Sequence, residues 1–292
     1  MKTKNLFGKA LLVALTLSVF TGCGGGDDSS SNTPNANASG GGGTGGDNTL
    51  PDIQAPSLVG NAVLWLKADT GVLTDSDGVT TWADQSQSGL TCENGTLAGH
   101  DGTVTSGPAI SHPSYKARGQ GGRPSVTFNG SGGGGTAENS IFCNGNSIAS
   151  STGFTVITVT NGTADGSDGW VVSDTNYAFS AGTTPTTLTG TLNGPSSTSV
   201  SASTSSALGS NQIVTYEFSL TSNQIFVAGQ NSSSSTGSLT SRNTGGDFQI
   251  GRRLVGDISE IIIFSSVLSD SDRQTVECYL GTKYGFTVAS CN

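Results

Sequence analysis

The feature that most constrains the fold of this chain is a series of short β-favouring runs separated by turn residues. The runs are rich in Val, Ile, Thr, Phe, Tyr and Trp, and stretches of Gly, Ser, Thr and Asn lie between them. They occupy residues 62–67, 123–129, 154–160, 170–173, 177–180, 213–219, 224–228, 248–251 and 258–264. This pattern predicts an all-β fold, a jelly-roll sandwich of two antiparallel sheets.

Two runs indicate how their strands are buried. Residues 154–160 place apolar side chains on both faces of the expected strand, which predicts a central strand covered on both faces. In residues 213–219 alternate positions are apolar, so one face of this strand is expected in the core.

One short helix is predicted near the C-terminus. Ser269 and Asp272 have the spacing of a capping box, and Gly285 has the position of a C-terminal cap. Apolar residues recur between them at helical spacing: Val276, Tyr279, Leu280 and Tyr284. The sandwich is therefore expected to carry a single C-terminal helix.

The N-terminal end is typical of a secretory signal. Three lysines precede an apolar run at residues 10–20, which is too short to span a bilayer of about 30 Å, and Cys23 follows Thr-Gly. The arrangement resembles the lipobox of bacterial lipoproteins, with Phe20 where Leu is usual. The resemblance implies that residues 1–22 are removed and that Cys23 is lipidated, anchoring the protein to a membrane of the bacterial cell envelope, the outer membrane. An ordinary signal peptide with a chance cysteine is the alternative.

The segment after Cys23 is predicted to be a tether. Residues 24–50 are mostly Gly, Ser, Asn, Asp and Thr, with no large apolar residue before Leu50. A flexible coil of this length reaches about 30 Å. We therefore expect a lipidated cysteine and disordered tether over residues 23–51, and one folded domain over residues 52–292.

Charge and cysteine content narrow the class of protein. The formal charge is −9, and removal of residues 1–22 with their three lysines brings it to −12 (−9 − 3). Such a chain is not expected to bind nucleic acid.

Four cysteines remain beyond Cys23, and they allow three pairings. We favour Cys92 with Cys143 and Cys278 with Cys291. Zinc is the disfavoured alternative, because there is no C-x-x-C motif and only two histidines.

Motifs at both ends of the predicted domain carry a family resemblance. Residues 64–69 (Leu-Trp-Leu-Lys-Ala-Asp), 79–86 with Gly89, 123–130, 250–252, 256–264, 268–273 and 279–285 resemble laminin-G-like domains of the concanavalin A-like lectin and glucanase superfamily. The resemblance implies a jelly roll, and it implies binding of a glycan or a protein only weakly, because this fold hosts many functions. Residues 163–210 match no motif of the family.

The sequence offers no recognisable catalytic machinery. Glycan-cleaving enzymes need two carboxyl groups about 5–9 Å apart. The nearest candidates, Asp257 and Glu260, are placed on opposite faces by strand alternation. We therefore predict a non-catalytic protein that binds a glycan or a partner protein. The alternatives are a structural envelope lipoprotein, or an enzyme with acids such as Glu217 and Glu260 from separate strands.

Trp170 and Tyr177 are the candidate ligand contacts. Trp170 follows a loop of turn residues and begins a predicted strand, where an exposed indole could stack on a sugar. Its alternative role is to anchor the edge of the sandwich.

Calcium is the one cofactor that the acidic loops would suit. Asp165 and Asp168 lie in one such loop, and Asp75 and Asp77 lie in another. The alternative for both loops is that the carboxylates accept hydrogen bonds from their own backbone.

Overall fold

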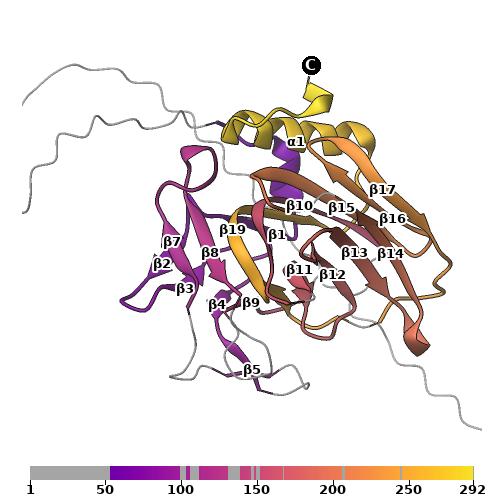
Figure 1. Ribbon diagram of the computed structural model, residues 1–292, viewed down its shortest axis with the longest axis horizontal. Coiled ribbons are helices and arrows are strands. Elements are labelled where there is room, and N and C mark those ends of the chain that lie inside the picture. Colours follow the sequence, from indigo (N-terminus) through magenta and orange to yellow (C-terminus); the bar gives the residue numbers. More distant parts are fainter. Residues whose placement is uncertain are drawn as a thin grey trace, which may run out of the picture. The chain divides into compact units, whose positions relative to one another are not determined.

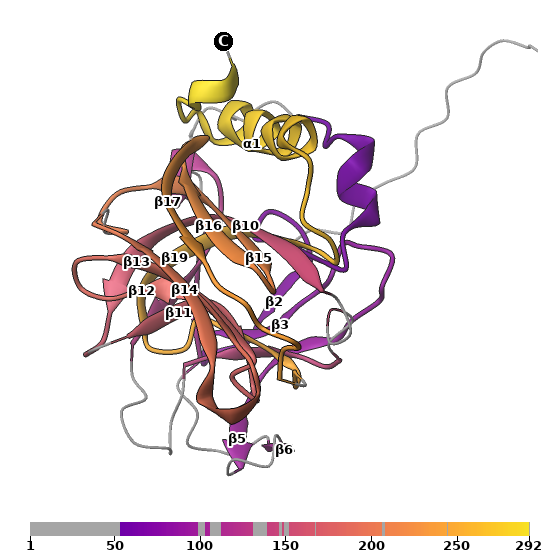
Figure 2. The same cartoon turned by 90° about the vertical axis from the view of Figure 1, so that its right-hand side faces the viewer.

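The computed structural model describes residues 53–98, 103–105, 112–130, 139–145, 148, 152–166, 168–205, 208–243 and 245–291. Cys23, the signal segment and the tether lie outside the described residues. The described part forms two antiparallel sheets and the helix α1 (Asp270–Tyr284), stacked in three layers (Figures 1 and 2). The predicted all-β sandwich with one C-terminal helix is confirmed.

The first sheet, sheet A, lies in the middle of the three layers. Its strand order is β17-β16-β15-β10-β19-β8-β7, and β1 also pairs with β19. The bounds are β1 (Leu64–Lys67), β7 (Ser114–Lys116), β8 (Ser125–Asn129), β10 (Gly153–Ala164), β15 (Gln212–Ser219), β16 (Ser222–Val227), β17 (Gln230–Thr236) and β19 (Leu254–Phe264). The strand predicted to be central, β10, lies between β15 and β19.

The second sheet, sheet B, forms the outer layer on the side away from the helix. Its order is β14-β13-β12-β11-β18-β9-β4-β3-β2. The bounds are β2 (Val72–Thr74), β3 (Val79–Trp82), β4 (Cys92–Asn94), β9 (Ile141–Cys143), β11 (Gly169–Asp174), β12 (Phe179–Thr183), β13 (Leu188–Asn193), β14 (Ser199–Thr204) and β18 (Phe248–Ile250). A separate pair is formed by β5 (Thr96–Ala98) and β6 (Thr103–Thr105). Short 3₁₀ turns are η1 (Ser57–Asn61), η2 (Gln120–Gly122), η3 (Pro195–Ser197) and η4 (Ala289–Cys291).

Two hydrophobic clusters hold the layers together. The larger lies between the sheets and includes Phe154 and Phe218, whose rings stack with centroids 4.7 Å apart. The smaller joins the other face of sheet A to α1, through residues such as Ile157 and Leu280. Sheet A is therefore buried on both faces, as its apolar strands require.

Helix α1 has the predicted ends and is fixed to sheet A by buried ion pairs. Ser269 Oγ accepts a hydrogen bond from the N–H of Asp272, and Gly285 takes the left-handed conformation at φ 69°. Glu260, fully buried on β19, accepts hydrogen bonds from Lys283 Nζ at 2.7 Å and from Trp65 Nε1 at 2.7 Å. Lys283 also pairs with Asp69 at 2.9 Å.

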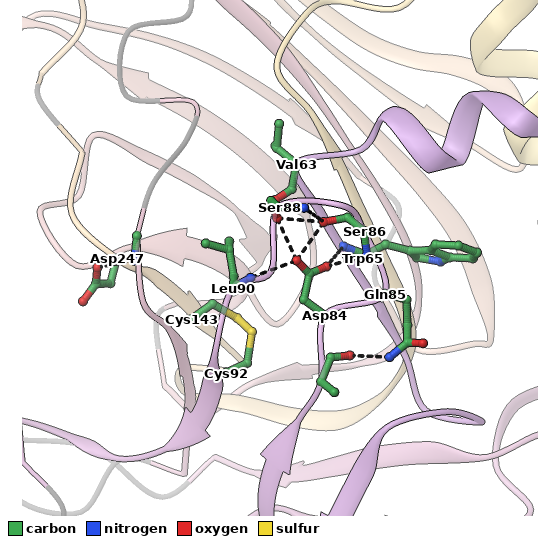
Figure 3. The surroundings of a disulfide bond; sticks show 12 residues. Val63, Trp65, Asp84, Gln85, Ser86, Ser88, Leu90, Cys92, Cys143 and Asp247 are labelled. Atoms are coloured by element: carbon green, nitrogen blue, oxygen red, sulfur yellow. Dashed lines mark hydrogen bonds between the residues drawn. A yellow bond between two sulfur atoms is a disulfide. The ribbon is translucent and has the colours of Figure 1, made fainter. Parts of the chain in front are cut away.

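Both predicted disulfides are present. Cys92 and Cys143 are directly opposite each other on β4 and β9, and Cys278 joins α1 to Cys291 in η4. Figure 3 shows the first disulfide beside the loop that follows β3. The carboxylate of Asp84 organises that loop, because it accepts hydrogen bonds from the backbone N–H groups of Trp65 and Leu90 as well as from nearby serines.

The structure corrects two local predictions. Tyr177 does not lie in a strand: it has φ 55° in a turn, and β12 starts only at Phe179. A register shift between β10 and β19 leaves Ser259 without a partner in β10. Because of this bulge, Asp257 and Glu260 lie on the same face of sheet A and not on opposite faces.

Within the described residues, no helix combines the length and hydrophobicity needed to cross a bilayer.

Candidate functional site

The outer face of sheet B is lined by small polar side chains over its last strands. One cross-strand row runs from Ser173 on β11 through Ser180, Thr191 and Ser201 to β14. Ser173 is fully buried, Ser180 and Thr191 are half-buried, and Ser201 is exposed. Helix α1 lies on the other side of the sandwich (Figure 2), and the row is exposed to solvent where it reaches β14.

Trp170 and Tyr177 come together at one side of this face. Their rings meet edge to face with centroids 5.3 Å apart. The guanidinium of Arg252 lies 4.4 Å from the Trp170 ring centroid and 5.3 Å from that of Tyr177. Trp170 is half-buried, and a Cβ at the neighbouring Gly182 would lie only 3.1 Å from its Cδ1 atom. The two residues singled out from sequence thus form one aromatic cluster, with a cation that the sequence did not indicate.

A hollow of about 390 Å³ opens beside Tyr177. Apart from Tyr177, its lining comes from three asparagines, from Gly194 and from the hydroxyl residues that follow β13. The full lining is Asn176, Tyr177, Asn193, Gly194, Ser196, Ser197, Thr198 and Asn243. Carboxamides and hydroxyls can both donate and accept hydrogen bonds, so this wall can match a ligand rich in hydroxyl groups.

The turn that presents Tyr177 is held from two sides. The buried Asp174 accepts hydrogen bonds through Oδ1 from the N–H groups of Asn176 at 3.0 Å and Ala178 at 2.9 Å. From the other side, Asn193 Nδ2 donates to the carbonyl of Tyr177 at 2.7 Å. These contacts stabilise the left-handed conformation of Tyr177, which is unfavourable for a bulky residue.

Several residues that line the hollow have strained backbone conformations. Among the described residues other than glycine, five have positive φ, and three of these line the hollow: Tyr177 at 55°, Ser196 at 57° and Ser197 at 61°. Such conformations cost about 1–3 kcal/mol each and cluster at functional sites.

Asp174 has an unusual acidity beneath this turn. Burial raises its pKa to about 6, although the N–H groups of Ala178 and Asn176 and the charge of Arg242 oppose the rise. The turn is therefore supported by a carboxyl group that gains its proton near pH 6.

The two aspartates proposed as calcium ligands are not arranged alike. Asp168 Oδ1 lies 3.2 Å from Arg253 Nη1 in an ion pair, whereas Asp165 is exposed. Within the described residues, no three His, Cys, Asp or Glu side chains gather closely enough to hold a metal ion. Calcium binding at this loop stays a prediction, with one of its two carboxylates already engaged by a cation.

The acids considered for catalysis lie on the helix side of sheet A. Glu260 is fully buried among Lys283, Trp65 and Tyr284. Glu217 Oε1 lies 3.4 Å from Arg273 Nε beneath α1. Neither residue lines the hollow beside Tyr177. Both carboxylates thus serve to attach the helix to the sheet.

Sequence reasoning missed most of the hollow. Asn193 and Asn243 are separated by fifty positions, and a backbone contact between the end of β13 and the segment after β17 brings them together: the N–H of Asn243 donates to the carbonyl of Asn193 at 2.8 Å. The one available signal was the Asp-Thr-Asn sequence at residues 174–176, which is typical of a turn stabilised by an aspartate side chain.

Comparisons with known proteins show the fold. The binding domain of Paraclostridial Mosquitocidal Protein 1 matches with a TM-score of 0.56 at 12% identity, over 78% of this chain and 56% of that chain. The binding domain of Botulinum Neurotoxin DC solved with SialylT gives 0.51 at 15% identity, over 74% and 50%. The same domain solved with rat synaptotagmin II gives 0.52 at 14% identity, over 77% and 52%. The chain thus spans about half the length of these domains. No protein-family model matches it, and no curated protein matches it.

Proposed function

We propose that this protein is a non-catalytic glycan-binding protein that recognises its ligand on the outer face of sheet B. The observation that carries the proposal is the aromatic pair of Trp170 and Tyr177 beside a hollow lined by carboxamides and hydroxyls. Binding sites commonly combine aromatic surface with a few polar groups that fix orientation.

The chemistry of the site suits a sugar. One face of a pyranose ring presents C–H groups, which pack against the electron-rich face of an aromatic ring. The hydroxyls around its edge need partners that both donate and accept, and Asn193, Asn243 and Thr198 offer such groups. The fully buried core of a protein–protein interface is usually more apolar than this wall of carboxamides and hydroxyls.

The solved toxin domains of similar fold support a binding role. The Botulinum Neurotoxin DC domain was solved with SialylT and, separately, with rat synaptotagmin II, so one domain that includes this fold takes ligands of more than one kind. The polar lining here favours the glycan. The positions of Glu217 and Glu260 beneath α1 support a role without catalysis.

We further propose that the domain is held at the bacterial cell envelope, at the outer membrane, by lipid on Cys23. The N-terminal sequence supports this, and the tether of about 30 residues would let the domain reach roughly 30 Å from its anchor. Mass spectrometry of the mature N-terminus tests the anchor. We expect a lipidated Cys23 as first residue, and an unmodified N-terminus at another residue would contradict it.

The binding proposal is tested by screening the full mature chain on a glycan array and then measuring affinity for the best ligand by calorimetry. We expect Trp170→Ala to weaken binding at least tenfold, about 1.4 kcal/mol. Tyr115→Ala is the matched control, because Tyr115 is an exposed aromatic residue on β7 in the other sheet.

Three outcomes would contradict the proposal. They are the absence of any glycan ligand, an unchanged affinity in a folded Trp170→Ala variant, and the release of soluble sugar from a bound polysaccharide. The last would restore the enzymatic alternative.

A further inference from the structure

We infer that the hollow beside Tyr177 selects an uncharged sugar unit and rejects the corresponding uronic acid. This rests on the proposed function and goes further by naming the class of sugar. The aromatic cluster provides general affinity for the face of a sugar ring, whereas the hollow contacts the substituents of that ring and discriminates between them.

Among the described residues, the lining of the hollow carries no charged side chain. Apart from Gly194 and Tyr177, it consists of three asparagines and three hydroxyl residues, which are Ser196, Ser197 and Thr198. A carboxylate that leaves water needs a positive charge or several strong donors to replace its hydration. A neutral hydroxymethyl group in the same place needs only the amide and hydroxyl partners that are present.

The nearby cations are held elsewhere. Arg252 stacks on the rings of Trp170 and Tyr177 but is not part of the lining of the hollow. Arg242 is adjacent in sequence to Asn243, but its guanidinium lies 5.3 Å from the ring centroid of the buried Phe154 and does not line the hollow. Among the described residues, the wall of the hollow therefore has no arginine or lysine to hold a sugar carboxylate.

The wall is also fixed before a ligand arrives. Asp174 and Asn193 hold the Tyr177 turn from opposite sides, and the N–H of Asn243 is bonded to the carbonyl of Asn193. A preformed wall cannot easily move to accommodate a group that it does not match, so discrimination between similar sugars is expected to be large.

The test uses pairs of sugars that differ only in the charged group: glucose with glucuronic acid, galactose with galacturonic acid, and mannose with mannuronic acid. Each sugar competes with the array ligand for the full mature chain. In at least one pair we expect the neutral member to compete at least tenfold better than its acid.

A charge placed in the wall should reverse this preference. Asn243→Lys puts an ammonium group in the hollow and leaves the backbone hydrogen bond from residue 243 intact. We therefore expect the affinity for the neutral sugar, divided by the affinity for its acid, to fall at least tenfold. Thr275→Lys is the matched control, because Thr275 is exposed on α1, away from sheet B, and does not line the hollow. It should leave the ratio unchanged.

The outcomes separate this inference from the proposed function. If Trp170→Ala weakens glycan binding but Asn243→Lys leaves the ratio unchanged, the inference is wrong and the proposed function stands. If the wild-type protein binds acids as well as neutral sugars, or if none of the six sugars competes, the inference is also wrong. If Trp170→Ala has no effect on binding, the proposed function itself fails.

Discussion

The outer faces of the two sheets differ in what covers them and in what their side chains can do. On sheet A, Ile157, Ile262 and Ile213 face outward, and α1 packs over them. On sheet B, the outward row over β12 to β14 consists of Ser180, Thr191 and Ser201. The first face contributes to stability through apolar burial and ion pairs, and the second is left free to meet a ligand.

Antiparallel strands of similar apolar content on their inner faces can thus have very different outer faces. Both sheets bury one apolar face against the other in the common core. The two sheets differ in their outer faces. Apolar residues on the outer face of sheet A are buried under α1, whereas the small hydroxyl residues on the outer face of sheet B can contact water.

The largest effect is expected from breaking the attachment of α1. Glu260→Ala removes the acceptor for Lys283, Trp65 and Tyr284 and leaves a buried ammonium with less compensation. We expect a loss of about 3–5 kcal/mol in the free energy of unfolding, measured by urea denaturation. Glu93→Ala, at an exposed position on sheet B, should change it by less than about 0.5 kcal/mol. Equal losses in the two variants would remove the distinction between the faces.

The disulfide on the helix side should have the next largest effect. Cys278 and Cys291 are separated by 13 positions, and closing such a loop contributes about 3 kcal/mol in the chain-entropy treatment. The double variant Cys278→Ala with Cys291→Ala should therefore unfold at lower urea concentration. Because this bond lies beyond α1 from sheet B, glycan affinity at 25 °C should not change. A loss of affinity would show that the two faces are coupled.

A pH effect of intermediate size is expected at the same layer. Burial raises the pKa of Glu217 to about 7, above the ordinary value of 4.5, and the nearby Arg273 only partly opposes the rise. The folded state therefore keeps a proton that the unfolded state loses above pH 4.5, so this group's contribution to stability falls between pH 4.5 and 7. Thermal unfolding from pH 4.5 to 8 should show a shallower decline in Glu217→Gln, and an identical decline would contradict the assignment.

The smallest effect is expected on the open face. Thr191 Oγ1 and Ser201 Oγ lie 3.0 Å apart in a hydrogen bond that is exposed to solvent. Thr191→Val should therefore change the free energy of unfolding by less than about 0.5 kcal/mol in the same urea experiment. A much larger loss would mean that the outer face of sheet B supports the fold as strongly as that of sheet A does.

The parts of the molecule that could be predicted from sequence are those with local signals. The strand of residues 154–160 was identified by apolar residues on both of its faces, and the helix ends were identified by Ser269 and Gly285. The position of Glu260 was not predictable in the same way, because the bulge at Ser259 leaves no local mark in the sequence.

The candidate site was only partly predictable for a related reason. Trp170 and Tyr177 stood out as aromatic residues beside turns, but the site lies in residues 163–210 and 243–252, most of which carry no family motif. Asn193 and Asn243 have no distinguishing neighbours in sequence. Their proximity depends on a backbone contact between β13 and the segment after β17, and Asn193 also contacts the Tyr177 turn; both contacts are properties of the folded chain.

The described domain begins on the side away from the outer face of sheet B. Ile53 and the turn η1 pack with α1, in the layer farthest from that face. The start of the domain and the cluster of Trp170 and Tyr177 are therefore on different layers of the sandwich. If Cys23 carries the lipid proposed above, many copies held on one surface could bind a repeating polymer together, and their joint affinity would exceed that of a single site.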